Sequence, residues 1–274
     1  MYKRILSAVN EFLNSEVAAK YALHLAKECN AKLYLCFIAG KGPCFNRAEE
    51  ALKRLFLQAE KMGIDAEIIM ETGDPVNKIL EIVKNEKIDI AFAATRREDI
   101  KRRFYEGTVS RSLLLKLPCS VAIIRVAHIG KLHPKRILVP LRTGAGKIDE
   151  KAFFTTKLAE AFGSKVFLLH SPKSITKFFH GEVRLTHSEL EKKIPEDLLI
   201  FASKMEKDNI PCEISLAAGS TGRAITIEAF AKRHDLIIMG ASRRGLLKTA
   251  IKGSPVEEVL RETPCDLIIF KSRT

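Results

Sequence analysis

The sequence contains no tryptophan and only four tyrosines, and none of its six cysteines forms a Cys-x-x-Cys pair. Without that spacing there is no signature of a zinc site or a redox motif. Cys119 and Cys265 each follow a proline and precede an apolar run, which is typical of a buried structural cysteine. We therefore interpret Cys119 and Cys265 as buried core residues and expect a structural role for the cysteines as a group.

Long apolar segments are also absent. No run reaches the roughly 18 residues that a membrane-spanning helix needs, and the first residues lead directly into a strand-like segment rather than a signal peptide. We expect a cytoplasmic protein without membrane contact.

The usual catalytic motifs are missing. The sequence has no Gly-x-Ser-x-Gly, no Gly-x-x-x-x-Gly-Lys-Ser/Thr and no His-Glu-x-x-His. His180 and His187 form a loose pair, but no cysteine or acidic cluster accompanies them. We expect no metal site and no catalytic residue.

Positive charge is abundant: 46 Lys and Arg against 33 Asp and Glu give a net charge of +13. Such a charge attracts nucleotides, polyphosphate, nucleic acid or acidic lipid, although a solvated basic surface explains it equally well. Nucleic-acid binding is a minor alternative, because no groove-reading or base-stacking motif accompanies the charge.

The chain repeats itself. Five residues recur 146 positions later in the same order; they are Gly73, Arg97, Gly107, Pro118 and Cys119, followed by Gly219, Arg243, Gly253, Pro264 and Cys265. Near the start of each copy the shift is only 132 positions, from Arg4-Ile5-Leu6 to Arg136-Ile137-Leu138, so the second copy carries an insertion. Solenoid repeats are about 20–50 residues long. We therefore predict two copies of one domain.

Apolar runs alternate with helical patterns in both copies, which predicts parallel sheets with helical crossovers. We expect strands near 5–9, 32–37, 66–70, 88–93 and 121–124, then near 137–139, 166–170, 213–216, 236–239 and 267–270. We expect helices near 18–26, 47–62, from Pro75 and before the strand at 121–124, then near 150–162, 195–208 and 224–233. The predicted domains are 1–126 and 136–274, joined by a linker at 127–135, with the insertion near 173–190.

Ligands of such sheets bind beyond the carboxyl ends of the strands, where the strand order reverses. After the fourth strand of the second copy comes Gly240, then position 243, then Gly253-Ser254. This spacing resembles the signature of the universal stress protein family: Gly, two residues, Gly, nine residues, Gly, then Ser or Thr. The Gly before the third helix and the Pro-Cys before the last strand extend the resemblance along both copies.

The resemblance implies two tandem Rossmann-like domains of the adenine nucleotide alpha hydrolase type. Each would have a five-stranded parallel sheet flanked by helices, and the two would pack as a pseudo-dimer through their last strands. It also implies a pocket for ATP or AMP, with Mg²⁺ only beside ATP, in which glycine-rich backbone and a helix N-terminus hold the phosphates. The second-copy residues it assigns to this pocket are Leu141, Arg142, Gly240, Ala241, Arg243, Arg244, Gly253 and Ser254.

The second copy departs from the family pattern at two key positions. Arg243 replaces the second glycine, and Arg142 stands where the family has an Asp after the first strand. These arginines would either contact phosphate directly or fill the pocket. Moreover, Ser254-Pro255-Val256-Glu257 reads as a capping box with Pro at the first helical position, which needs no ligand.

The first copy departs further. Ala94 and Arg97 replace the two glycines, and Asn10 replaces the Asp, while Gly107 and Thr108 are kept. Its weaker set of candidate residues is Val9, Asn10, Ala94, Arg97, Gly107 and Thr108.

We therefore predict a stress-response protein acting as a sensor or regulator, with at most weak ATP hydrolysis because the Ser-Gly-Gly-x-Asp-Ser loop of related ATP pyrophosphatases is absent. Its degenerate site for an adenine nucleotide or other anion lies mainly in the second copy. The alternative is a scaffold that binds a protein partner and no nucleotide; a homodimer is compatible with both.

Overall fold

The structure is a computed structural model that describes residues 2–40, 45–95, 108–130, 132–141, 148–170, 194–216, 221–241 and 255–273. Its centre is one ten-stranded sheet with the order β3-β2-β1-β4-β5-β10-β9-β6-β7-β8. The strands are β1 (Arg4–Ala8), β2 (Lys32–Ala39), β3 (Ala66–Thr72), β4 (Ile90–Ala94), β5 (Ser120–Arg125), β6 (Arg136–Pro140), β7 (Lys165–His170), β8 (Cys212–Leu216), β9 (Leu236–Gly240) and β10 (Asp266–Lys271).

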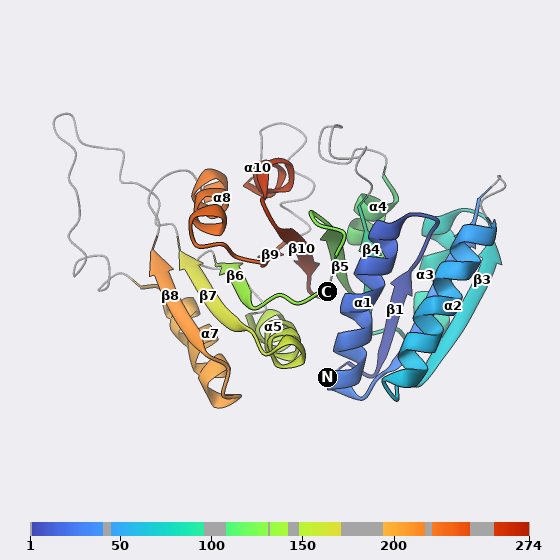
Figure 1. Cartoon of the computed structure of the whole chain (residues 1–274), viewed down its shortest axis with the longest axis horizontal. Helices are drawn as coiled ribbons and strands as arrows, with labels where there is room; N and C mark the ends of the chain where they lie inside the picture. Colours follow the sequence, from blue (N-terminus) through green and yellow to red (C-terminus); the bar gives the residue numbers. More distant parts are fainter. Residues whose placement is uncertain are drawn as a thin grey trace.

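The two halves of the chain meet at β5 and β10, in the middle of the sheet (Figure 1). Within each half all pairings are parallel, but β5 and β10 pair antiparallel, with Arg125 opposite Leu267 and Val121 opposite Lys271. The predicted pseudo-dimer through the last strands is confirmed. As a consequence, the carboxyl ends of the first half's strands and those of the second half's strands lie at opposite edges of the sheet.

Helices cover both faces of the sheet. The described helices are α1 (Leu13–Cys29), α2 (Phe45–Lys61), α3 (Pro75–Asn85), α4 (Val109–Lys116), α5 (Ile148–Phe162), α7 (Glu196–Lys207), α8 (Thr221–Ala231) and α10 (Pro255–Glu262). One core lies under α1, α2, α5 and α7, and the other under α3, α4, α8 and α10. Strand residues alternate between the cores, as Ile268 and Ile269 of β10 do.

The halves share a core as well as a sheet. Phe154 of α5 is fully buried, stacks on Phe270 of β10 with ring centroids 4.5 Å apart, and lies 6.2 Å from Phe92 of β4 in the first half. Helices α1 and α5 also pack against each other across the junction. The apolar contact between the halves is therefore part of the main core.

Local sequence signals set several element boundaries. At the start of α3, the Asp74 side chain accepts a hydrogen bond from the Asn77 N–H and Pro75 takes the first helical position, as predicted. Gly73, just before this cap, has a φ of 136°, which only glycine adopts without strain. The expected helix at 224–233 is instead α8, which begins at Thr221 and ends at Ala231 because Arg233 takes a left-handed φ of 50°.

The cysteines described by the structure are unpaired, and Cys36, Cys119 and Cys265 are buried. Burial raises the pKa of each of these three thiols to about 12, so they stay protonated. The predicted burial of Cys119 and Cys265 is confirmed, whereas Cys29 and Cys212 are half-buried and Cys44 lies outside the described residues. Among the described helices, none combines the length and apolar character that crossing a membrane requires.

Candidate functional site

The candidate site of the second half lies at the carboxyl ends of β6 and β9. These strands are neighbours, with Leu138 opposite Ile237. After β6 the chain adds β7 and β8 on one side of β6, and it then crosses back to place β9 on the other side. The strand order therefore reverses between them, which is where parallel α/β sheets bind ligands. Leu141 follows β6 here, Gly240 is the last residue of β9 and Ala241 follows it.

The backbone of this edge is held by the sheet. The Leu141 N–H donates to the Leu169 carbonyl at 2.9 Å, and the Ala241 N–H donates to the Phe270 carbonyl at 2.8 Å. Gly240 itself is exposed, and a Cβ added to it would meet only Lys151, at 3.8 Å from both Cδ and Nζ. An atom placed on Gly240 would thus sit directly beside an amine.

Lys151 is a member of this site that sequence reasoning missed. It belongs to the first turn of α5, is 8% exposed, and donates from Nζ to the Pro140 carbonyl at 3.0 Å. Burial lowers the pKa of its amine to about 7. A lysine inside the apolar stripe of a helix was the sequence signal that could have identified it.

Five predicted second-half residues lie outside the described part of the chain: Arg142, Arg243, Arg244, Gly253 and Ser254. Arg97 and Gly107 of the first-half set, His180 and His187, and the insertion near 173–190 also lie outside it. The helix expected after Ser254 is present as α10, which begins at Pro255.

The corresponding edge of the first half satisfies its own polar groups. The Asn10 side-chain oxygen accepts from the Phe12 N–H at 3.0 Å, and the Asn10 N–H donates to the Ser15 hydroxyl. The Thr108 hydroxyl accepts from the Arg111 N–H and thereby caps α4. Val9 is buried, and Ala94 places a methyl group where the second half has Gly240. The described members of the first-half set therefore serve as core, turn and cap residues.

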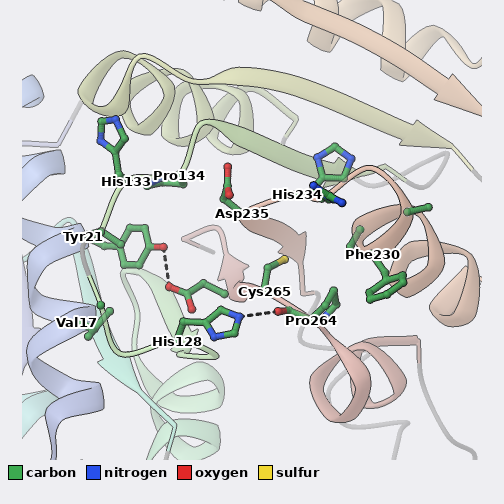
Figure 2. Close-up of a pocket in the computed structure, with 16 residues that line it drawn as sticks. Val17, Tyr21, His128, His133, Pro134, Phe230, His234, Asp235, Pro264 and Cys265 are labelled. Carbon is green, nitrogen blue, oxygen red and sulfur yellow. Dashed lines mark hydrogen bonds between the residues drawn. The ribbon is translucent and has the colours of Figure 1, made fainter.

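A concave region lies elsewhere, between the halves, at the amino ends of β9 and β10 (Figure 2). This cleft has a volume of about 700 Å³ and is bounded by α1, the segment after β5 and the turns before β9 and β10. The Tyr21 hydroxyl donates to the Asp266 carboxylate at 3.0 Å, and Nε2 of His128 lies 3.1 Å from the Pro264 carbonyl oxygen. Tyr21, His128 and Pro264 are labelled in Figure 2.

The acidic groups of this cleft already have structural partners. Asp266 accepts from the Ala127 N–H at 2.8 Å, and Asp235 accepts from the backbone N–H groups of Lys135 and Arg136. Burial raises the pKa of Asp266, and the donors around it oppose that rise. These contacts fasten the segment between the halves, so we assign the cleft a structural role.

His234 borders the same cleft and is 4% exposed. Burial, together with the nearby Arg136, lowers its pKa to about 4, and its ring meets Phe167 edge-on at 4.8 Å. It is a neutral packing residue. The described residues include no group of three or more His, Cys, Asp or Glu placed to hold a metal ion.

Comparison with known proteins shows the family. The model of the universal stress protein family matches residues 45–125 and again 134–271. A universal stress protein of Methanocaldococcus jannaschii is 25% identical over 141 residues, which cover 46% of this chain and 83% of that protein.

Solved structures show how widely the fold is used. The crystal structure of a universal stress protein from Archaeoglobus fulgidus matches with a TM-score of 0.66 at 18% identity, over 98% of this chain and 96% of that one. The cytoplasmic domain of a prokaryotic cation chloride cotransporter matches with a TM-score of 0.64 at 9% identity, over 100% of this chain and 96% of that one. The architecture alone therefore does not decide the function. The two family matches, however, span most of the sequence, and the chain belongs to the universal stress protein family, with two tandem copies of its domain.

Proposed function

We propose that this chain is a non-catalytic sensor or regulator whose second half binds an adenine nucleotide, ATP or AMP, or another phosphate-bearing anion. Gly240 would give the ligand close access to backbone, and Leu141 and Ala241, whose N–H groups bond within the sheet, would line the site. Mg²⁺ would accompany the ligand only if it is ATP. The sequence adds Arg142, Arg243, Arg244, Gly253 and Ser254 as further contacts.

One observation carries this proposal: exposed, Cβ-free Gly240 stands beside a buried amine at the reversal point of the second half. Backbone without a side chain lets a phosphate approach closely, and the amine offers it a positive charge. The net charge of +13 adds long-range attraction for anions. At the equivalent strand ends, the first half has Ala94 in place of glycine, and its Asn10 side chain is already bonded to the Phe12 N–H. We therefore assign the first half no ligand.

The test is a calorimetric titration with ATP and AMP of the wild type, Gly240→Ala and Gly40→Ala. The added methyl group at 240 makes only ordinary contacts, so the variant should fold normally while occupying the ligand's space. Gly40 is the matched control, because it likewise lies at the carboxyl end of a parallel strand, directly after β2, and a Cβ there meets nothing within 4 Å. We expect at least about tenfold weaker binding for Gly240→Ala alone, a loss of about 1.4 kcal/mol. Equal affinities in all three proteins would refute the assignment.

The second candidate function is a scaffold that acts through protein contacts, including a homodimer. Two large apolar side chains on α8 favour it: Phe230 is 75% exposed and Ile227 is 57% exposed. Sedimentation velocity of the wild type and Phe230→Ser tests it. A concentration-dependent dimer that the substitution abolishes, in protein that binds no nucleotide, would support the scaffold.

A further inference from the structure

Lys151 is unusual because the residue at the equivalent position of the first half carries no charge. Aligning α5 with α1 at a shift of 133 places Leu158-Ala159 on Leu25-Ala26 and Lys151 on Ala18. Ala18 is fully buried, and Lys151 is 92% buried. The same inward-facing position therefore holds a methyl group in one half and an ammonium group in the other.

The described residues offer this amine little compensation. It donates one hydrogen bond, to the Pro140 carbonyl, although an ammonium group has three donors. Glu150, its neighbour on α5, directs its carboxylate to the hydroxyls of Ser120 and Tyr2 instead. Asp149 forms its ion pair with Lys204 of α7 at 2.8 Å.

Among the residues described, helix α1 and the ends of β6 and β9 supply no counter-charge either, and burial is what lowers the pKa of Lys151. Glu16 of α1 pairs with Arg54 at 2.8 Å, and the described ends of β6 and β9 carry no acidic side chain. His170, at the end of β7, lies with Nδ1 3.3 Å from the Leu141 carbonyl. Burial is the cause that lowers the Lys151 pKa to about 7, so its proton is readily lost near neutral pH.

The surroundings of Lys151 also offer a place for an anion. Its Nζ lies 3.8 Å from the position that a Cβ of Gly240 would occupy, and Gly240 is exposed. A phosphate oxygen resting on the Gly240 backbone would therefore lie within reach of the amine. Replacing a buried carbonyl contact by a charge-assisted bond to phosphate would stabilise the ammonium form.

We propose that Lys151 is the cation that recognises a phosphoryl group at the second-half site, and that ligand binding makes it take up a proton. This inference rests on the proposed function and adds to it a specific residue and a dependence on pH. The recognised chemistry is the phosphoryl group itself, whether it belongs to a nucleotide or to inorganic polyphosphate.

The experiment is a calorimetric titration at pH 7.5 and pH 9.0 with ATP, AMP and inorganic tripolyphosphate, in buffers of different ionisation enthalpy. The proteins are the wild type, Lys151→Met and Lys157→Met. Methionine keeps the length and apolar stem of lysine without its charge, so the variant should fold. Lys157 lies on the same helix but pairs with Glu160 at 2.5 Å, and it serves as the matched control.

For the wild type and Lys157→Met we expect roughly tenfold weaker binding at pH 9.0 and net proton uptake at pH 7.5. Lys151→Met should bind weakly at both pH values and take up no proton. Similar affinities for tripolyphosphate and ATP would show that the site recognises only the phosphates. A higher affinity for ATP would show that the nucleoside also contributes to binding.

Two results would overturn the inference, and they differ. Wild-type binding that is independent of pH and unchanged in Lys151→Met would show that Lys151 does not contact the ligand, while the proposed function would still hold. If none of the three ligands binds at millimolar concentration, both the role of Lys151 and the proposed function are wrong.

Discussion

At the scale of single residues, the buried charged side chains differ in how many hydrogen-bond partners they have. The carboxylate of Glu150 receives two hydroxyl donors, and that of Asp266 receives a hydroxyl and a backbone N–H. Lys151 has one carbonyl acceptor among the described residues. Because an incompletely compensated buried charge is costly, this position reduces stability, as functional sites often do.

Replacing Lys151 by Met should raise stability and flatten its dependence on pH. Between pH 7 and the ordinary lysine value of 10.5, the unfolded chain holds a proton that the folded amine has released, so wild-type stability rises with pH. From pH 7 to pH 9 the gain attributable to this residue should be about 2 kcal/mol. Urea denaturation of wild type, Lys151→Met and Lys157→Met at both pH values measures it.

The difference between variants removes the contribution of other titrating groups. Lys151→Met should lack the rise and be the most stable of the three at pH 7, whereas Lys157→Met should keep the rise. If wild type and Lys151→Met change in parallel, the amine is not the source.

At the scale of elements, α8 and α10 approach each other closely at Gly222. This glycine is buried in α8, and a Cβ added to it would lie 2.7 Å from Cδ and 2.9 Å from Cβ of Glu258 on α10. Two helices that pack at such a point need a residue without a side chain. The glycine thus sets the distance between the elements that flank β9.

Gly222→Ala should therefore destabilise the protein by about 1–3 kcal/mol, because Glu258 or α10 must move. Thermal unfolding followed by circular dichroism measures the loss, with Gly40→Ala as the control in open space. Adding Glu258→Ala should recover part of the loss, since Cδ is removed while Cβ remains. Equal melting temperatures for Gly222→Ala and Gly40→Ala would contradict the packing described.

Much of the element structure was predictable from local patterns, but the site was predictable only in part. Alternating apolar runs identified the strands, and Asp74-Pro75 identified the start of α3. Motif spacing led to Gly240, yet it could not show that Asn10 bonds to its own turn or that Lys151 reaches Gly240. Those contacts depend on which face of each helix packs against the strand ends. The spacing of motif residues within one loop does not reveal that orientation.

At the scale of the whole molecule, the antiparallel β5–β10 pair makes one sheet out of two domains (Figure 1). The chain has no tryptophan, and its four tyrosines all lie in the first half. Tyrosine fluorescence therefore reports on the first half and, through the contacts of Tyr2 with Glu150 and of Tyr21 with Asp266, on its junction with the second half. Circular dichroism reports on the whole chain. This makes the coupling between the halves measurable without labels.

Phe154→Ala, in the second half, should lower the stability of the entire chain by about 3–5 kcal/mol, because Phe154 fills the shared core between Phe270 and Phe92. In urea, the fluorescence and dichroism transitions should shift together to a lower midpoint. A fluorescence midpoint that stays at the wild-type value would mean that the halves unfold independently.

We propose that the two similar domains differ in function, because only the second binds a phosphate-bearing ligand. The decisive experiment is native mass spectrometry of the wild type and Gly240→Val after incubation with ATP. We predict one nucleotide per wild-type chain and none on Gly240→Val. Three results would contradict this asymmetry: two nucleotides bound per wild-type chain, no nucleotide on the wild type, or a nucleotide still bound to Gly240→Val.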